Sequence, residues 1–427
     1  MNAFDVLAER GFVEQVTDEK DVRDLLGREA VTCYIGFDPT ASSLHIGSLV
    51  PIMALAHMQR HGHRPIVLIG GGTALIGDPS GKSEMRQILS LEKVEENASA
   101  LKDQLSQYLD FREDRALMLN NAAWLTALNY IEFLRDVGRH FSVNRMLAAE
   151  SYRMRLEKGL NFIEFNYMLL QAYDFYYLRK HHGCTLQMGG NDQWGNIVAG
   201  IDLTRRLEGK TVYGVTFPLL TTSQGHKMGK TERGTVWLDG GLTSPYEYFQ
   251  YWMNTEDADV HRFLCLFTFL PLEEIGEARK LKDARLNMAK TVLAFEATKI
   301  THGQNDAERA WQASAEAFSL NPVDQGLFPS STIPRVSGES TVTAIPSVIV
   351  PFRRFDGGIP AFELFFEAGL CASKGEARRL LDQGGGYVNG RAVARFDERI
   401  TLKDAEGSGE IRLRKGKKRF VRVRIET

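Results

Sequence analysis

The alternation of strand-like and helix-like apolar segments near the start of the chain constrains its fold most. Residues 31–38 are an apolar run typical of a buried strand, and a polar segment at 39–43 leads into helical apolar spacing over 45–61. A second strand is expected at 65–71, followed by a Gly-rich turn and an amphipathic helix over 91–109. Strand, helix and strand in this order are typical of a parallel sheet.

The next segments continue the same scheme. In order, they are a short strand near 116–119, mostly helical spacing over 127–181, a strand at 185–188, a helix at 197–207 and a strand at 215–220. We therefore predict an α/β fold in which residues 1–221 form a Rossmann-like doubly wound parallel sheet, with a helical insertion at about 122–182.

Further domains are expected after this sheet. A chain of 427 residues is too long for one hydrophobic core. Helical spacing from 244 to 318 predicts a helical domain within 222–320, and prolines spread among Ser, Thr and Gly predict an extended linker over 321–358. Residues 359–427 then form a small α+β domain with two short helices and short strands.

Charge is distributed unevenly along the chain. The formal net charge is only -2, yet the segment 412–424 carries many Lys and Arg residues and no acidic residue. A local basic cluster of this kind predicts a nucleic-acid contact more strongly than the total charge argues against one.

The cysteines, the N-terminal residues and the length of the apolar runs predict a soluble cytoplasmic protein. The four cysteines are scattered without a CxxC pair, so neither a zinc site nor a disulfide framework is predicted. The N-terminus lacks the pattern of a signal peptide, and no apolar run reaches the length of a membrane span. His57, His61 and His63 are spaced like metal ligands, but no carboxylate or cysteine joins them, so we interpret them as a polar face and predict no metal ligand.

The turn after the first strand carries a cluster of chemistry-bearing residues: Gly36, Asp38, Thr40, His45 and Gly47. A helix start presents unpaired N–H groups and a partial positive charge, which suits a triphosphate. His45 and Thr40 would donate to phosphate oxygens there. A capped helix with a surface histidine is the alternative interpretation.

A segment at 77–83 resembles a phosphate-binding P-loop, but the required Gly six residues before Lys82 is Ile76, so we reject that motif. Lys82 and Arg86 are four residues apart, which places two cations on one helix face. They fit phosphate ligands and a solvated helix face equally well.

Two further segments place polar side chains where a ligand is expected. Tyr167, Gln171 and Asp174 share one face of a predicted helix, either toward a small polar ligand or as an exposed stripe. A Gly turn after the strand at 185–188 precedes Asp192 and Gln193, which suit a ribose hydroxyl and a substrate.

The loop at 224–231 carries two lysines, Lys227 and Lys230, three positions apart. Lysines on such a loop stabilise a departing pyrophosphate when the loop closes over it. Ordinary exposed lysines are the alternative interpretation.

Taken together, these motifs resemble the bacterial tyrosyl-tRNA synthetases of class I, along almost the whole chain. The matching segments are 34–47, 77–82, 133–146, 165–175, 189–196 and 243–252, together with the lysine loop. The residues that match the family's tyrosine pocket are Tyr34 and Asp174 for the phenol and Asp78, Tyr167, Gln171 and Gln193 for the ammonium group. The residues that match its ATP site are Gly36, Asp38, Gly47, Ser48, Gly190, Asp192 and Lys230 around the nucleotide, and Thr40, His45, Lys82, Arg86, Lys227, Lys230 and Thr231 around the phosphates and pyrophosphate.

The resemblance implies a two-step reaction. Tyrosine and ATP, with accompanying Mg²⁺, give tyrosyl-adenylate and pyrophosphate, and the tyrosyl group then passes to the terminal ribose of tRNA(Tyr), with no tightly bound cofactor. It also implies that the helical domain reads the anticodon, that 359–427 is an S4-type RNA-binding domain, and that 133–146 forms the contact of a homodimer.

Both motifs depart from the class I pattern. Ser48 stands where the first motif usually has a second histidine, and Gly229 and Thr231 replace serines of the second motif. The related tryptophanyl enzymes are a competing interpretation, against which Tyr34 and Asp174 argue because tryptophan has no phenolic hydroxyl. A non-catalytic RNA-binding descendant is another, against which the retained lysines argue.

Overall fold

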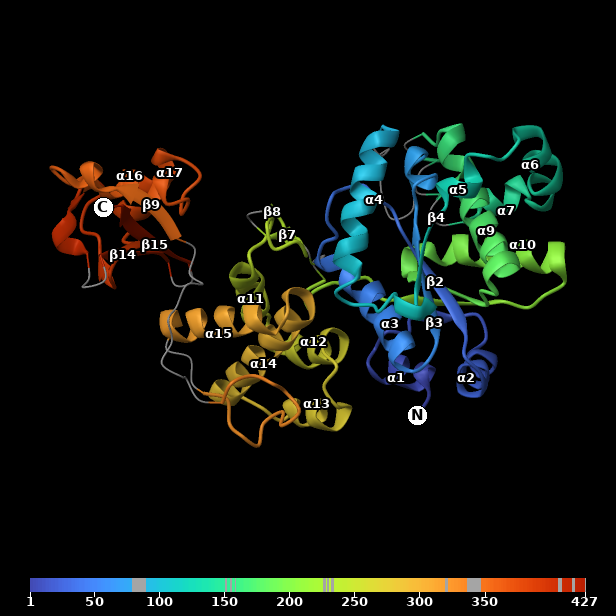
Figure 1. Cartoon of the computed structure of the whole chain (residues 1–427), viewed down its shortest axis with the longest axis horizontal. Coiled ribbons are helices and arrows are strands. Elements are labelled where there is room, and N and C mark those ends of the chain that lie inside the picture. Colours follow the sequence, from blue (N-terminus) through green and yellow to red (C-terminus); the bar gives the residue numbers. More distant parts are fainter. Residues whose placement is uncertain are drawn as a thin grey trace. The chain divides into compact units, whose positions relative to one another are not determined.

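The computed structural model describes the chain in two compact units. It leaves out residues 79–89, 150–151, 154–155, 158, 226–227, 229, 232–233, 319–321, 336–346, 406–408, 417–418 and 427, and it gives only the backbone of Lys230 and Thr231. The first unit comprises residues 1–303 and 325–332, and the second comprises 304–324 and 333–427 (Figure 1).

The first unit is built on a six-stranded sheet, in agreement with the predicted doubly wound fold. Its strands are β1 (Gln15–Val16), β2 (Thr32–Phe37), β3 (Arg64–Ile69), β4 (Leu117–Asn120), β5 (Leu186–Gly190) and β6 (Tyr213–Phe217). The order is β1-β6-β5-β2-β3-β4, and every pairing except β1 with β6 is parallel. The chain therefore leaves β2 in one direction and resumes on its other side at β5, which makes the gap between these strands the switch point where open sheets bind ligands.

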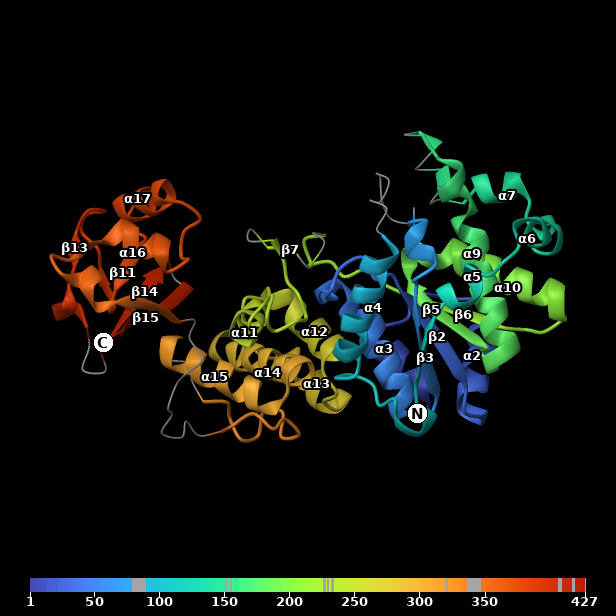
Figure 2. The same ribbon diagram turned by 45° about the horizontal axis from the view of Figure 1, so that its top comes forward.

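Helices cover this sheet on both faces (Figure 2). They are α1 (Ala3–Glu9), α2 (Glu19–Arg28), α3 (Leu49–Arg60), α4 (Leu91–Leu105), α5 (Ala122–Leu125), α6 (Tyr130–Asp136), α7 (Val143–Leu147), α9 (Phe162–His182) and α10 (Trp194–Glu208). Buried β-branched and leucine side chains of the strands, such as Ile66 and Val67, pack beneath them. The predicted insertion thus consists of α5 to α9.

Helix α3 begins later than the spacing predicted. His45 is the N-cap of a 3-10 turn at Ile46–Ser48, and Ser48 then precedes the first residue of the α-helix. The tighter turn makes an additional change of direction between strand and helix. This leaves the first motif in a turn rather than in a regular helix.

The predicted helical region forms α11 (Pro245–Met253), α12 (Val260–Phe267), α13 (Leu272–Ala278), α14 (Asp283–His302) and α15 (Gln304–Phe318). Ser244 starts α11 with a reciprocal capping box to Glu247, and Pro245 occupies the first turn. Helices α11 to α14 belong to the first unit, whereas α15 groups with the second, so the boundary predicted at 320 falls instead near 303.

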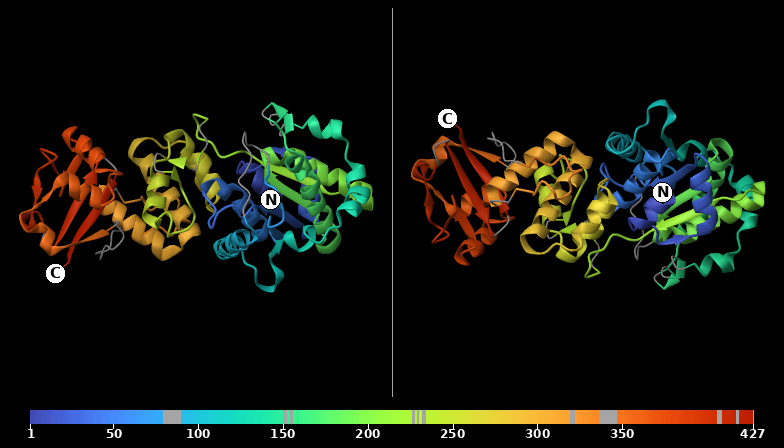
Figure 3. Two further views of the ribbon diagram at one scale, coloured as in Figure 1. Left: turned by 90° about the horizontal axis from the view of Figure 1, so that it is seen from above. Right: turned by 90° about the horizontal axis from the view of Figure 1, so that it is seen from below.

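The second unit contains a five-stranded sheet of order β12-β11-β14-β15-β9 (Figure 3). Its strands are β9 (Ser347–Pro351), β11 (Gly386–Val388), β12 (Arg391–Ala392), β14 (Glu410–Lys415) and β15 (Arg419–Glu426). A two-stranded sheet of β10 (Ile359–Pro360) and β13 (Arg399–Ile400) accompanies it, with helices α16 (Ala361–Glu367) and α17 (Lys374–Asp382).

The predicted linker over 321–358 is wrong in two places. Strand β9 pairs in parallel with β15, because Val348, Ile349 and Val350 are β-branched residues whose strand signal the surrounding prolines hid. Residues 325–332 belong to the first unit, where the Ser331 hydroxyl donates a hydrogen bond to Glu296 at 2.6 Å. In the described part of the chain, no helix is long and apolar enough to cross a membrane.

Candidate active site

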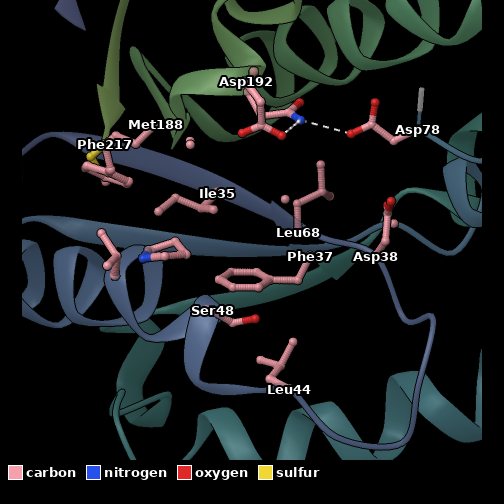
Figure 4. A pocket seen from close by; sticks show the side chains of 18 of the residues that line it. Ile35, Phe37, Asp38, Leu44, Ser48, Leu68, Asp78, Met188, Asp192 and Phe217 are labelled. Carbon is pink, nitrogen blue, oxygen red and sulfur yellow. Dashed lines mark hydrogen bonds between the residues drawn. The ribbon is translucent and has the colours of Figure 1, made fainter. Parts of the chain in front are cut away.

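A cavity of about 440 Å³ lies at the carboxyl ends of β2 and β5, at the switch point of the sheet (Figure 4). It brings together fourteen predicted site residues from segments far apart in sequence. They are Tyr34, Gly36, Asp38, Thr40, His45, Gly47, Ser48, Asp78, Tyr167, Gln171, Asp174, Gly190, Asp192 and Gln193.

The other five predicted residues are not placed at this cavity. Lys82, Arg86 and Lys227 lie outside the described residues, and Lys230 and Thr231 are described only as β7, which pairs with β8 (Gly234–Thr235). Their roles therefore stay predictions.

One end of the cavity is a buried carboxylate beside a buried phenol. Asp174 on α9 is 2% exposed and accepts hydrogen bonds from Trp124 Nε1 at 2.7 Å and Asn121 Nδ2 at 2.9 Å. Burial raises the pKa of Asp174 to about 7, against the lowering effect of these two donors. This carboxyl group therefore changes its protonation near neutral pH.

Tyr34 on β2 completes this end. Its hydroxyl is buried and has no hydrogen-bond partner among the residues that the structure describes. Burial, and next the neighbouring Asp174, raise the pKa of Tyr34 well above its ordinary value, so the hydroxyl stays protonated. A buried hydroxyl without a partner is costly, and a ligand that both donates and accepts a hydrogen bond would satisfy it.

A chain of hydrogen bonds connects the Asp174 carboxylate to Asp38, the residue after β2. Asn121 Nδ2 also donates to Thr73 Oγ1 at 3.1 Å, and Thr73 Oγ1 lies 3.4 Å from Asp38 Oδ1. No motif in the sequence indicates Asn121, Trp124 or Thr73. Asn121 directly follows β4, so attention to the carboxyl end of that strand could have found it.

Carboxylate and amide groups line a second region of the cavity. Gln193 Nε2 donates to Asp78 Oδ2 at 2.9 Å (Figure 4), and Asn196 Nδ2 donates to Gln171 Oε1 at 3.0 Å. Tyr167 is 5% exposed, and Gln171 is half-buried. The exposed-stripe interpretation of α9 is therefore wrong, since its polar face lines a cavity rich in hydrogen-bond acceptors.

The turn before α3 forms a third region. His45 Nδ1 accepts a hydrogen bond from the Gly47 N–H at 3.0 Å, so in the neutral ring the proton sits on Nε2, which is a donor. A Cβ at Gly47 would lie 2.7 Å from His45 Cε1, so any other residue at this position would clash with the His45 ring. Ser48 makes no side-chain capping bond to α3.

Gly36 leaves part of the cavity open. A Cβ built at this position of β2 meets no atom within 4 Å, although its neighbours in the strand are buried. An added methyl group would therefore occupy cavity space and displace no protein atom.

The predicted polar histidine face is wrong for two of its three members. His57 is 3% exposed and its ring packs edge-on against Phe12 and Phe269, and burial lowers the pKa of His57 to about 2. His63 is also buried and accepts a hydrogen bond from the Val31 N–H at 3.1 Å. Across the described residues, no group of three or more His, Cys, Asp or Glu side chains is placed to hold a metal ion.

Comparisons with known proteins give consistent matches. The family model described as tRNA synthetases class I (W and Y) matches residues 27–319. A tyrosine–tRNA ligase of Syntrophus aciditrophicus is 64% identical over 425 residues, covering 100% of this chain and 99% of the relative. A tyrosine–tRNA ligase of Desulfatibacillum aliphaticivorans is 59% identical, covering 99% of this chain and 98% of the relative.

Solved structures agree. A C-terminally truncated mitochondrial tyrosyl-tRNA synthetase of Aspergillus nidulans superposes with a TM-score of 0.67 at 30% sequence identity. The match covers 74% of this chain and 94% of that one.

Proposed function

The chain belongs to the class I aminoacyl-tRNA synthetases of the tyrosine and tryptophan group, and we propose that the cavity at the switch point is where it activates tyrosine. Its activity is that of a tyrosine–tRNA ligase, with tyrosine, ATP and tRNA as substrates. The observation that carries the site assignment is the Tyr34 hydroxyl, which has no hydrogen-bond partner among the described residues and lies beside the buried Asp174 carboxylate.

The substrate phenol binds between these two groups. Its hydroxyl donates to Asp174 and accepts from Tyr34, so both buried groups gain a partner. Phenylalanine and tryptophan have no phenolic hydroxyl, so neither can provide the hydrogen bonds that Tyr34 and Asp174 make with tyrosine. Tyrosyl-tRNA synthetases are the well-known case of such discrimination, in which the wrong substrate leaves buried polar groups unpaired.

The substrate ammonium group lies among Asp78, Tyr167 and Gln171, with Gln193 beside them. Asp78 supplies the charge, and the hydrogen bond from Gln193 holds its carboxylate in place. This contact orients the tyrosine carboxylate toward the α-phosphate of ATP.

ATP occupies the rest of the cavity. Asp38, Gly190 and Asp192 contact the adenosine, Gly36 and Gly47 leave room for it, and Thr40, His45 and Ser48 donate to the phosphates. The tyrosine carboxylate oxygen forms a bond to the α-phosphorus as the bond to pyrophosphate breaks, with no covalent enzyme intermediate. Mg²⁺ enters with ATP as part of the substrate and neutralises phosphate charge.

Cations surround the departing pyrophosphate. By the family resemblance these are Lys82, Arg86, Lys227 and Lys230, with Thr231 in the same loop. Their charge stabilises the negative charge that develops on the leaving group.

The second unit contributes to tRNA binding as an S4-like domain, together with anticodon reading by α11 to α15. Its sheet carries half-buried basic side chains on β14 and β15, namely Arg412, Arg414 and Arg424, and Arg414 lies over the Tyr387 ring at 3.8 Å. Arg422 is buried and pairs with Glu410. Such a surface suits phosphates and stacked bases.

The chain acts as a homodimer. Large apolar side chains are exposed on α6 and α7, among them Ile131 at 69% and Val143 at 55%. Several exposed apolar side chains on these two helices support an interface, and their positions overlap the predicted subunit contact at 133–146.

Amino-acid-dependent pyrophosphate exchange tests the proposed function. We expect exchange with tyrosine and none with tryptophan or phenylalanine at equal concentration. Exchange driven by tryptophan would overturn the phenol site.

A further inference from the structure

Tyr177 lies outside the cavity lining, yet it contacts the indole that holds Asp174. Its ring stacks on Trp124 with the centroids 4.2 Å apart and the planes inclined by 14°. The Nε1 of the same indole donates to Asp174 Oδ1 at 2.7 Å. Trp124 therefore contacts the carboxylate through its edge and Tyr177 through its face.

Both contacts come from one helix. Asp174 and Tyr177 are three residues apart on α9 and so share a face. Trp124 sits on α5, a helix of only four residues, which has little stability of its own. Two contacts from α9, the Tyr177 ring and the Asp174 carboxylate, therefore help to hold the indole in place.

We propose that Tyr177 is a positioning residue for tyrosine specificity: its ring keeps Trp124 in the orientation that holds the Asp174 carboxylate toward the substrate phenol. This inference rests on the proposed function of the cavity. Without the stack, the indole turns, its N–H leaves Asp174, and the carboxylate loses one of the two donors that hold it.

The effect is confined to substrates with a phenolic hydroxyl. Phenylalanine makes no hydrogen bond to Asp174, so a displaced carboxylate does not weaken its binding. The ratio of kcat/KM for tyrosine to that for phenylalanine therefore reports the position of Asp174, whereas a general loss of stability lowers both values together.

The experiment compares three variants in pyrophosphate exchange with both amino acids. For Tyr177→Leu we expect a KM for tyrosine raised about threefold to tenfold with little change in kcat, and a tyrosine-to-phenylalanine ratio lowered by the same factor, as expected for losing one aromatic stack. Tyr177→Phe keeps the ring and should keep the ratio. Tyr176→Leu is the matched control, a half-buried tyrosine of the same helix whose ring contacts Tyr173 at an angle of 53° and makes no ring contact to Trp124.

An unchanged ratio in Tyr177→Leu overturns the inference. Trp124→Phe distinguishes this failure from failure of the proposed pocket, because it removes the N–H donor itself. If the tyrosine-to-phenylalanine ratio falls in Trp124→Phe and is unchanged in Tyr177→Leu, only the role of Tyr177 is rejected. Unchanged ratios in both reject the phenol site as well. If circular dichroism shows that Tyr177→Leu folds poorly, Tyr177→His replaces it, since histidine keeps a smaller flat ring. This variant should give an intermediate tyrosine-to-phenylalanine ratio, and an unchanged ratio counts equally against the inference.

Discussion

The side-chain amide of Gln193 donates a hydrogen bond to the carboxylate of Asp78 at 2.9 Å, joining the turn after β5 to the segment after β3. Asn196 in turn donates to Gln193 Oε1 at 3.1 Å, so the amide is held from both sides. The group proposed to receive the substrate ammonium is thereby oriented before tyrosine arrives.

Removing this amide should weaken tyrosine recognition. We expect Gln193→Ala to lower kcat/KM for tyrosine about tenfold, or about 1.4 kcal/mol, because a hydrogen bond to a charged group is lost. Steady-state pyrophosphate exchange measures it. Gln59→Ala is the control, since Gln59 makes a comparable bond to the Asp110 carbonyl away from the cavity. Equal losses in the two variants would contradict a role for Gln193 in the site.

Tyrosine binding should release a proton near pH 6.5. Burial raises the pKa of Asp174 to about 7 in the free protein, so the carboxyl group is mostly protonated at that pH. A phenol that donates to the carboxylate favours its ionised form and lowers the pKa, so binding expels the proton. Affinity should then fall as the pH drops below 7.

Calorimetric titration in buffers of different ionisation enthalpy measures this release. At pH 8 the carboxyl group is already ionised, so the buffer dependence should largely disappear. A binding enthalpy independent of the buffer at pH 6.5 would show that the phenol does not contact an Asp174 that titrates.

Gly36→Ala should affect ATP and leave folding intact. A Cβ at this position meets no protein atom within 4 Å and projects into the proposed nucleotide space. We expect an unchanged melting temperature and a KM for ATP raised at least severalfold. Gly276→Ala, whose Cβ is equally unobstructed but lies on α13, should leave the KM for ATP unchanged, and it should raise the melting temperature slightly because alanine favours a helix over glycine. A normal KM for ATP in Gly36→Ala would place the nucleotide elsewhere.

His57 should make the protein less stable in acid. Burial lowers the pKa of His57 to about 2, so below its ordinary value of 6.5 the unfolded chain binds a proton that the folded chain does not. The free energy of unfolding therefore falls as the pH drops below 6.5, by up to about 1.4 kcal/mol per pH unit. Urea titrations of the wild type and His57→Leu between pH 4.5 and 7 give the free energy of unfolding at each pH, and the slopes of this free energy against pH are then compared. Identical slopes would mean that His57 is protonated in the folded state.

Truncation before residue 347 should separate the two steps of the reaction. Strand β9 belongs to the sheet of the second unit, so a cut at 359 would leave one of its edge strands behind. Removing residues 347–427 should leave tyrosine activation within about twofold and lower tRNA charging at least about tenfold, since phosphate contacts dominate affinity for nucleic acid. Equal losses in both steps would contradict a tRNA-binding second unit.

The sequence predicted the sheet well because its strands are continuous apolar runs separated by helical spacing, as at β2 and β3. Fourteen of the nineteen site residues predicted from the sequence line the cavity, and they belong to motifs whose spacing is local. What it missed depends on contacts between distant segments. Trp124 and Asn121 acquire their role only where β4 and α5 meet α9, and His57 is buried because Phe12 and Phe269 pack against it.

A structure of the chain with bound tyrosine decides whether the substrate phenol binds between Tyr34 and Asp174. We predict the phenol oxygen within about 3 Å of both the Tyr34 hydroxyl and an Asp174 carboxylate oxygen, with the bonds from Asn121 and Trp124 to Asp174 retained. A phenol oxygen that contacts neither residue, or a tyrosine bound outside this cavity, would contradict the assignment.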